Sequence, residues 1–307
     1  MRGVLAALCL LALPLMLGGT SSSPAFAGSD LRAPLPMPAR DRHEQLLRWL
    51  ALNPPPAIEA PVATPPTPAE ASSSPMTRPL APRLVIIIDD IGNNLQQGER
   101  SAGLPGPLNL AILPYTPHAT HLATLGHAQG KEIMLHAPME NHQQLALGPG
   151  ALTLGMDRSG FTEQLAESLD SVPFVRGVNN HMGSLMTEQA QQMHWTMGVL
   201  QERGLFFVDS RTSSNTVGAR TAEAVGVPHL SRQVFLDHER DPLAIADAFE
   251  RGLRIARQTG TAVLIGHPYP ETLDLLEQRL PELEAEGISL VSAGQLIGQQ
   301  QVAHKTP

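Results

Sequence analysis

The sequence predicts an α/β fold, a barrel-like domain of about seven parallel strands, within a chain of 307 residues. Between residues 83 and 298, apolar runs of strand length alternate with stretches that carry helix signals, and alternating β and α units favour a mostly parallel sheet. This alternation continues for roughly 215 residues without an internal repeat, a length that suits one barrel better than two small domains.

The first predicted strand spans residues 84–89, in the segment Leu84-Val-Ile-Ile-Ile-Asp-Asp-Ile-Gly92. A continuous aliphatic run closed by a glycine is typical of a strand that is buried on both faces. Burial of a carboxylate costs free energy unless a cation or hydrogen bonds compensate. Asp89 and Asp90 at the end of this strand therefore indicate a site; the alternative is a loop whose acids are solvated or cap the next element.

The other predicted strands follow at short intervals along the chain. They are residues 108–113, 132–136, 174–179, 205–209, 229–236, 262–266 and 289–291. Three helices have clear signals between them: one capped by Thr187 and ending at Gly204, one that begins at Asp241-Pro242 and ends at Gly260, and one over residues 271–286. Residues 299–307 are expected to form a polar tail.

The N-terminal part of the chain has a different composition. Residues 1–27 combine Arg2, an apolar stretch and the sequence Ala25-Phe-Ala27, which predicts a cleaved signal peptide and a periplasmic or secreted protein; an uncleaved anchor is the alternative. Residues 28–82 are rich in Pro, Ala and Ser and predict a disordered linker. Within this linker, residues 40–52 form a short amphipathic run, which is either a transient helix or a docking segment for a cell-wall protein.

Charge and cysteine content exclude several classes of function. The formal net charge is −8 and the sequence has no block of Lys or Arg, so we expect no nucleic-acid partner. The single cysteine, Cys9, lies in the predicted signal peptide, which excludes disulfides and thiolate chemistry from the mature chain. No second hydrophobic stretch follows it, so we expect no membrane span in the mature chain.

Polar side chains follow most of the predicted strands, at the end where each strand closes. They are Asp89 and Asp90, Tyr115 and His118, His136, Asn179 to His181, Asp209 and Arg211, and His267. Active sites of parallel α/β barrels are built at this face. An Asp with two neutral imidazoles suits Zn²⁺ or a similar divalent ion that keeps an open position. A second carboxylate and a further histidine would add a general base and a general acid, the parts of a metal-assisted amide or ester hydrolase.

Four motifs together resemble the divergent polysaccharide deacetylase family, a group related to the NodB-homology carbohydrate esterases. They are Ile88-Asp-Asp-Ile-Gly92, His136-Ala-Pro-Met-Glu140, Asn179-Asn-His-Met-Gly-Ser184 and Ile265-Gly-His-Pro268. The resemblance covers residues 83–297 and implies a distorted (β/α) barrel that removes acetyl groups from a glycan, such as peptidoglycan, through a metal-activated water.

The resemblance also implies roles for individual residues. Asp89 matches the catalytic base of the family, Asp90 its metal-binding aspartate, and His267 the histidine that assists the leaving group. His136 matches the first histidine of a metal motif whose second histidine is replaced here by Glu140.

We therefore expect the metal, Zn²⁺ in the first place, to be bound by Asp90, His136 and His181. Glu140, Asn180, Asp209 and Arg211 are expected to support these groups or to contact the substrate, and Glu140 is an alternative ligand. Asp209 and Arg211 occupy the region that orients or tunes the base in the family.

Two further hypotheses compete with a metal-dependent deacetylase. The missing second histidine and the long linker are compatible with a non-catalytic glycan- or protein-binding module on a deacetylase scaffold. A phosphoryl-accepting Asp89 with Mg²⁺ is disfavoured, because that chemistry usually requires acids spaced two apart and a lysine at a later strand end.

Overall fold

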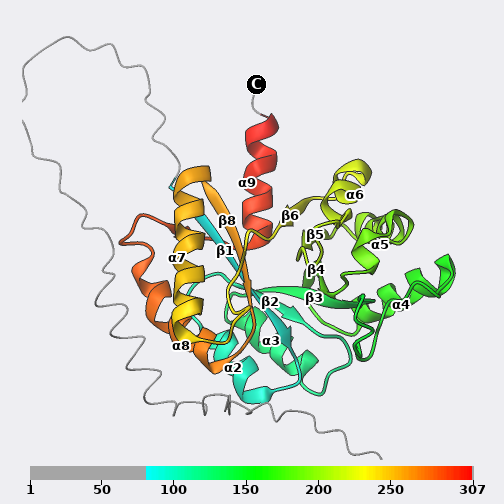
Figure 1. The fold of residues 1–307 in the computed structure, drawn as a ribbon, viewed down its shortest axis with the longest axis horizontal. Coiled ribbons are helices and arrows are strands. Elements are labelled where there is room, and N and C mark those ends of the chain that lie inside the picture. Colours follow the sequence, from blue (N-terminus) through cyan, green and yellow to red (C-terminus); the bar gives the residue numbers. More distant parts are fainter. Residues whose placement is uncertain (1–80, 306–307) are drawn as a thin grey trace, which may run out of the picture. The chain divides into compact units, whose positions relative to one another are not determined.

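The computed structural model describes residues 81–305, in which nine strands form one parallel sheet (Figure 1). The strands are β1 (Arg83–Ile91), β2 (Asn109–Ile112), β3 (Glu132–Met139), β4 (Val175–Met182), β5 (Phe206–Asp209), β6 (His229–Ser231), β7 (Val234–Phe235), β8 (Thr261–Gly266) and β9 (Ser289–Leu290). The α-helices are α2 (Leu95–Gly103), α3 (Ala119–Ala128), α4 (Arg158–Asp170), α5 (Ala190–Glu202), α6 (Gly218–Val225), α7 (Pro242–Thr259), α8 (Pro270–Arg279) and α9 (Ala293–Lys305). The predicted α/β class is confirmed, and each predicted strand is present.

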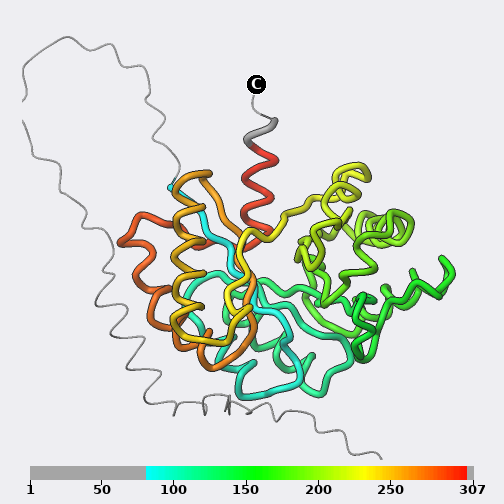
Figure 2. Tube along the Cα trace, in the orientation of Figure 1, coloured from blue at the N-terminus to red at the C-terminus, as the bar shows by residue number. Residues whose placement is uncertain are grey.

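The two edges of the sheet are joined by a single short segment. The strand order is β6-β5-β4-β3-β2-β1-β8-β7, with β9 added beside β1. The predicted strand over residues 229–236 pairs first with β5 and then, after only Arg232 and Gln233, with β8. Figure 2 shows this segment, in yellow, crossing from the β5 side to the β8 side. The sheet therefore curls into the distorted barrel that the sequence predicted.

Alternation along the strands separates two apolar cores. The larger core lies between the sheet and the helices and includes Leu84, Ile86 and Ile88 of β1. The smaller core fills the barrel interior and includes Val85 and Ile87 from the same strand. Successive side chains of a strand point to opposite faces, so the all-apolar run of β1 is buried on both sides.

Helix α9 closes the end of the barrel at which the strands begin. Ala293, Leu296 and Ile297 belong to the interior core. The first residues of β2 and β3 accept hydrogen bonds from the helix N-terminus, at 3.0 Å from Ala293 N to Asn109 Oδ1 and at 2.8 Å from Gly294 N to Glu132 Oε2. With this end closed, the face at which the strands end is left for a site.

Three expectations about the helices need correction. Thr187 does not cap α5, because it lies in a 3₁₀ turn (Met186–Glu188) where its hydroxyl donates to the Gly183 carbonyl. The helix expected over residues 271–286 ends at Arg279 and continues as a 3₁₀ turn (Leu280–Glu282), since Pro281 has no amide hydrogen to donate. The expected polar tail continues α9 as far as Lys305.

The predicted helix that begins at Asp241-Pro242 and ends at Gly260 is confirmed as α7. No helix within residues 81–305 is long and apolar enough to cross a membrane. The predicted signal peptide over residues 1–27 and the amphipathic run over residues 40–52 lie outside the described residues, as does the predicted linker up to residue 80.

Candidate metal centre and active site

Inward-facing side chains at the end of the barrel opposite α9 are polar rather than apolar. In β1 the interior positions Val85 and Ile87 are followed two residues later by Asp89. The same alternation, counted from the interior residues of the other strands, places further polar side chains on the inward face. The inward-facing set is Asp89, His136, Asn179, His181, Ser210, Arg232 and His267. Four side chains that the sequence analysis singled out for chemistry thus share one layer.

Asp90 joins this layer although alternation alone would turn it outward. Its backbone has φ +57°, and the pairing of β1 with β2 is irregular between Ile88 and Ile91. A bulge of this kind re-aims a side chain and is common beside active sites. Gly92 follows with φ +135°, and a Cβ there would lie 1.9 Å from Thr116 Oγ1. The two adjacent carboxylates therefore face one site.

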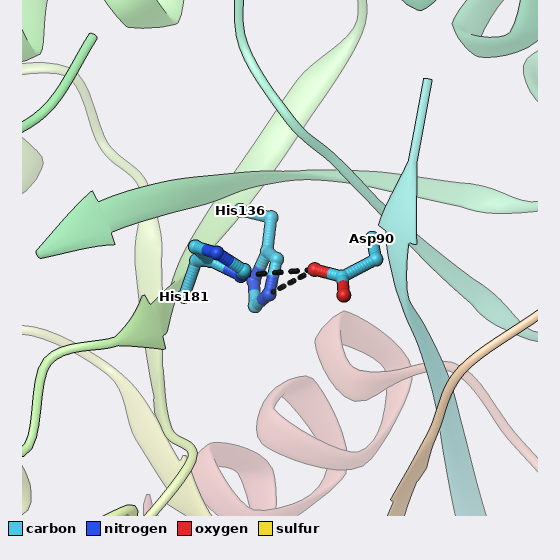
Figure 3. Close-up of side chains that lie close together, drawn as sticks. All are labelled: Asp90, His136 and His181. Atoms are coloured by element: carbon cyan, nitrogen blue, oxygen red, sulfur yellow. Dashed lines mark ion pairs between the residues drawn. The ribbon is translucent and has the colours of Figure 1, made fainter. Parts of the chain in front are cut away.

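Asp90, His136 and His181 form the candidate metal centre (Figure 3). Asp90 Oδ1 lies 3.3 Å from His136 Nε2 and 2.9 Å from His181 Nδ1. Neighbouring ligands of a tetrahedral Zn²⁺ are separated by about 3.3 Å, given metal–ligand bonds of about 2.0–2.1 Å. Asp90 Oδ1 is also buried without a hydrogen-bond partner among the described residues. Three potential ligand atoms that converge at these distances fit a divalent cation.

The electrostatics of the three ligands also favour a cation. Burial acts to raise the pKa of Asp90, but the adjacent His136 and His181 outweigh it and hold that pKa well below its usual range. Burial acts to lower the pKa of His136, yet Asp89 and Asp90 raise it overall. Both carboxylates therefore attract positive charge to the same point, which a metal ion supplies when the imidazoles are neutral.

Asn179 connects the metal centre to Asp89; the sequence analysis placed it at a strand end but gave it no role. Its Nδ2 donates to Asp89 Oδ1 at 2.8 Å, so its Oδ1 faces His136 Nδ1 at 2.9 Å. Because an amide oxygen only accepts, His136 must donate from Nδ1, and its Nε2 lone pair is then free for a metal. The register of β3 and β4, in which His136 pairs with Asn179, was the signal that could have identified it.

Asp89 lies beside the metal centre and is not one of its ligands. Its carboxylate is buried, with Oδ2 3.6 Å from His136 Nε2. Burial raises the pKa of Asp89, against the lowering effect of His136, His267 and Asn179. A carboxylate whose pKa is raised toward neutrality is a better proton acceptor than a solvated one.

His267 follows β8, the strand paired with β1, and is held by Asp237. Asp237 accepts from His267 Nδ1 at 2.9 Å, from its backbone N at 2.6 Å and from Thr272 Oγ1 at 2.8 Å. His267 Nε2 therefore points toward Asp90 Oδ2, 3.8 Å away. Burial opposes protonation of His267, but the hydrogen bond and charge of Asp237 raise its pKa to about 9. Asp237 directly follows the sixth predicted strand, whose end the sequence analysis did not consider.

The remaining predicted site residues support loops. Glu140 Oε2 accepts from Leu154 N at 2.7 Å, and its position lies outside the group of potential metal ligands. Asn180 accepts from Ser210 N and donates to the carbonyl of Met182. Both side chains fix the loops around the site, and neither contacts the ligands.

Asp209 and Arg211 do not orient Asp89. Asp209 lies on the helix side of β5, because its neighbour Val208 occupies an interior position. Its carboxylate accepts from the backbone of Arg211 and from Thr216 and Ala219 at the start of α6. The residue that contacts Asp89 in this geometry is Asn179, whereas Asp209 faces the start of α6.

A cleft opens beside the metal centre. It has a volume of about 440 Å³, and Asp90 and His181 form one end of its lining. The loop over residues 113–117 and the loop over residues 146–149 line the rest, with Tyr115 partly exposed at the edge. This volume is within the usual range for a small-molecule site.

The chain is similar to several known proteins. The family model described as divergent polysaccharide deacetylase matches residues 86–297. The uncharacterized protein YibQ of Escherichia coli strain K12 is 35% identical over 237 residues, covering 77% of this chain and 73% of YibQ. An uncharacterized protein of Haemophilus influenzae is 34% identical, covering 73% and 80%. The crystal structure of the uncharacterized protein ATU2773 from Agrobacterium tumefaciens C58 shares the fold, with a TM-score of 0.68 at 22% identity over 70% of this chain and 89% of that one.

Proposed function

Since the chain belongs to the divergent polysaccharide deacetylase family, we propose that it is an exported, metal-dependent hydrolase that removes acetyl groups from a glycan such as peptidoglycan. The observation that carries the proposal is the convergence of Asp90, His136 and His181 next to Asp89 and His267, beside a cleft. The N-terminal 27 residues support a location in the periplasm or outside the cell.

The metal, Zn²⁺ in this proposal, would be held by Asp90 Oδ1, His136 Nε2 and His181 Nδ1. When bound, it supplies Lewis-acid chemistry, which lowers the pKa of a water molecule to about 7 and polarises a carbonyl oxygen. Asn179 keeps His136 in the tautomer that can bind it. With three protein ligands, a bound Zn²⁺ would keep one coordination position for water or substrate.

Asp89 acts as the general base in this proposal. Its Oδ1 is held by Asn179, which leaves Oδ2 directed toward the metal centre. Oδ2 accepts a proton from the water molecule that attacks the acetyl carbonyl. Burial raises the pKa of this carboxylate, which makes it a better proton acceptor than a solvated one.

His267 acts as the general acid. Asp237 holds Nδ1 and the backbone amide, so Nε2 is the atom that can donate a proton to the departing amine or alcohol. Its raised pKa of about 9 keeps it protonated at neutral pH. Base and acid thus both lie beside the metal ligands, at the ends of the adjacent strands β1 and β8.

The direct test is acetate release. The full chain, loaded with Zn²⁺, is expected to release acetate from acetylated peptidoglycan fragments or chitin oligosaccharides, each product losing the mass of one acetyl group. A chelated sample serves as the control, with activity restored by added metal. If metal-loaded protein releases no acetate from any of these substrates, a non-catalytic glycan- or protein-binding module becomes the better hypothesis.

Replacement of Asp237 should change the pH dependence of this activity. Asp237→Asn removes the hydrogen bond to a carboxylate and the negative charge that raise the pKa of His267. Activity that depends on protonated His267 falls as pH rises through its pKa, so the alkaline limb of kcat against pH should move to lower pH. We expect an additional loss of roughly 10- to 100-fold at neutral pH, typical for an outer partner of a site. An unchanged alkaline limb would show that another group is the acid.

A further inference from the structure

Arg232 introduces a positive charge into the inward layer that contains the proposed catalytic residues. It follows the interior residue Leu230 by two positions, at the short segment where the chain crosses between the edges of the sheet. Its Nε donates to the Ser210 carbonyl at 2.6 Å and its Nη2 to the Arg211 carbonyl at 2.9 Å. Two backbone oxygens thus hold the guanidinium without neutralising its charge.

The surroundings of Arg232 place it beside the reaction centre. The Ser210 hydroxyl lies 3.3 Å from Nδ2 of Asn179, which also holds Asp89. On the other side, the Arg232 guanidinium lies over the Phe235 ring at 5.0 Å, and that ring packs edge-on against His267 at 5.3 Å. The cation is therefore linked by direct contacts to the supports of both the proposed base and the proposed acid.

This positive charge has no ion-pair partner in the described part of the chain, where no carboxylate oxygen lies within 4.0 Å of it. Arginine is rarely buried without such a partner. Burial and the adjacent Arg211 lower the pKa of Arg232, and Asp89 and Asp209 act in the opposite direction. A protein with a formal net charge of −8 thus holds two cations together at its proposed active site.

Arg211 has an unusual backbone conformation. It has φ +51°, and its amide donates to Asp209 Oδ1 at 2.9 Å. The αL conformation is unfavourable for a residue other than Gly, Asn or Asp and is found mostly where surrounding structure enforces it at functional sites. The side chain is exposed, so it is accessible to a ligand that reaches the more buried Arg232.

We propose that Arg232 and Arg211 bind an acidic group of the substrate, so that the glycan is anionic and carries a carboxylate or a phosphate near the acetyl group that is removed. This inference rests on the proposed function for the glycan, whereas the anion site itself does not depend on turnover. Guanidinium groups bind carboxylates and phosphates through paired, charge-assisted hydrogen bonds. In this proposal, the acidic group of the substrate is the negatively charged partner that Arg232 lacks within the described part of the protein.

Binding of matched ligands tests the proposal without requiring catalysis. Titration calorimetry on the full chain would compare a disaccharide that contains N-acetylmuramic acid, its methyl ester, a 6-phosphorylated N-acetylglucosamine disaccharide and the neutral N-acetylglucosamine disaccharide. We expect the free acid or the phosphate to bind roughly 10- to 100-fold more tightly than the ester and the neutral sugar, the range for a charged hydrogen bond. This preference should weaken with added salt.

Variants assign the preference to the two arginines. Arg211→Gln and Arg232→Gln should each reduce the preference for the acidic ligand and leave affinity for the neutral sugar unchanged. Arg232→Lys keeps the charge and should lose the preference in part, because the fork geometry is lost. Arg254→Gln, an exposed arginine on α7, is the matched control and should keep the preference.

The outcomes separate this inference from the proposed function. Equal affinity of wild type for the acid, the ester and the neutral sugar would overturn the anion site, whether or not acetate is released. A second outcome is that the wild type prefers the acidic ligand and the arginine variants lose this preference, while no protein sample releases acetate. That result would support the anion site and reject the deacetylase function. If Arg211→Gln and Arg232→Gln both keep the preference for the acidic ligand, the proposed anion site is also rejected. If Arg232 acts only on Asp89, its variants would shift the pH dependence of kcat without changing ligand preference.

Discussion

His136→Ala and His181→Ala are each expected to reduce bound divalent metal from near one equivalent to almost none. Each substitution removes one of the three atoms that converge on the centre, where Asp90 Oδ1 lies 3.3 Å and 2.9 Å from the two imidazole nitrogens. The remaining pair of ligands is too few for a structural or catalytic Zn²⁺ site, which uses at least three protein ligands. Metal content after incubation with Zn²⁺ and gel filtration, measured by plasma mass spectrometry, checks the prediction.

Glu140→Ala is the matched control for this measurement. Its carboxylate accepts from the Leu154 amide and is not directed at the metal centre, so metal content should stay near one equivalent although the loop over residues 140–154 loosens. Metal lost in Glu140→Ala but retained in His181→Ala would mean that Glu140, rather than His181, replaces the missing second histidine. If neither the wild type nor any of the three variants binds metal, the fold assignment still holds but the metal-dependent mechanism is rejected.

Asp89→Asn should reduce kcat for acetate release by about 10²- to 10⁴-fold, the usual contribution of a general base, and should leave metal content unchanged. Asn has nearly the same shape and can still accept the hydrogen bond from Asn179 through its Oδ1. It cannot take up the proton that Asp89 Oδ2 accepts. Steady-state kinetics and metal analysis on the same sample separate the two effects.

Thermal unfolding of the metal-free protein controls for a folding defect in Asp89→Asn. Because burial raises the pKa of Asp89, its charged form costs the folded state free energy at neutral pH, and this cost declines as pH falls from the folded-state pKa to the lower unfolded-state pKa. The neutral amide removes the cost, so Tm at pH 7 should be equal to or higher than that of wild type. Retention of more than half of the wild-type kcat would rule Asp89 out as the base.

Much of the fold was predictable because the apolar runs have the length of strands. The run that ends at Asp89 is aliphatic on both faces, and each later strand ends at or near a polar residue. Parallel strands all end at one face, so the proximity of Asp89, His136 and His267 followed from topology alone. The division of residues 229–236 between two partners was not predicted, although the polar residues Ser231 to Gln233 interrupt the segment where the pairing changes.

The orientation of side chains at the site could be predicted only in part. Alternation turns Asp209 toward α6, and applying it to β5 would have removed Asp209 from the site. For Asp90, alternation alone gives the wrong direction. Its φ of +57° and the bulge in β1 turn its side chain toward the site. The distinction between these two acids is one of backbone conformation, for which the residue type Asp gives no signal.

Partners that act through another side chain were the hardest to predict. Asn179 bridges His136 and Asp89 across two strands, which requires the register of the sheet to be known. Asp237 holds His267 from 30 residues away, at the end of a strand that was predicted correctly. Such residues bear no motif of their own, so only their place at the end of a strand marks them.

The position of β1 in the sheet sets an order for the folding of this chain. β1 lies between β2, which follows it closely, and β8, whose first residue is Thr261. One edge of β1 therefore stays unpaired until most of the chain has been made, and pairing over such a separation is slow. Asp89 and His267 are brought together only by the pairing of β1 with β8, so the proposed proton-transfer pair is absent from any form of the domain that lacks this pairing. Until then the open edge of an aliphatic strand is a site for aggregation.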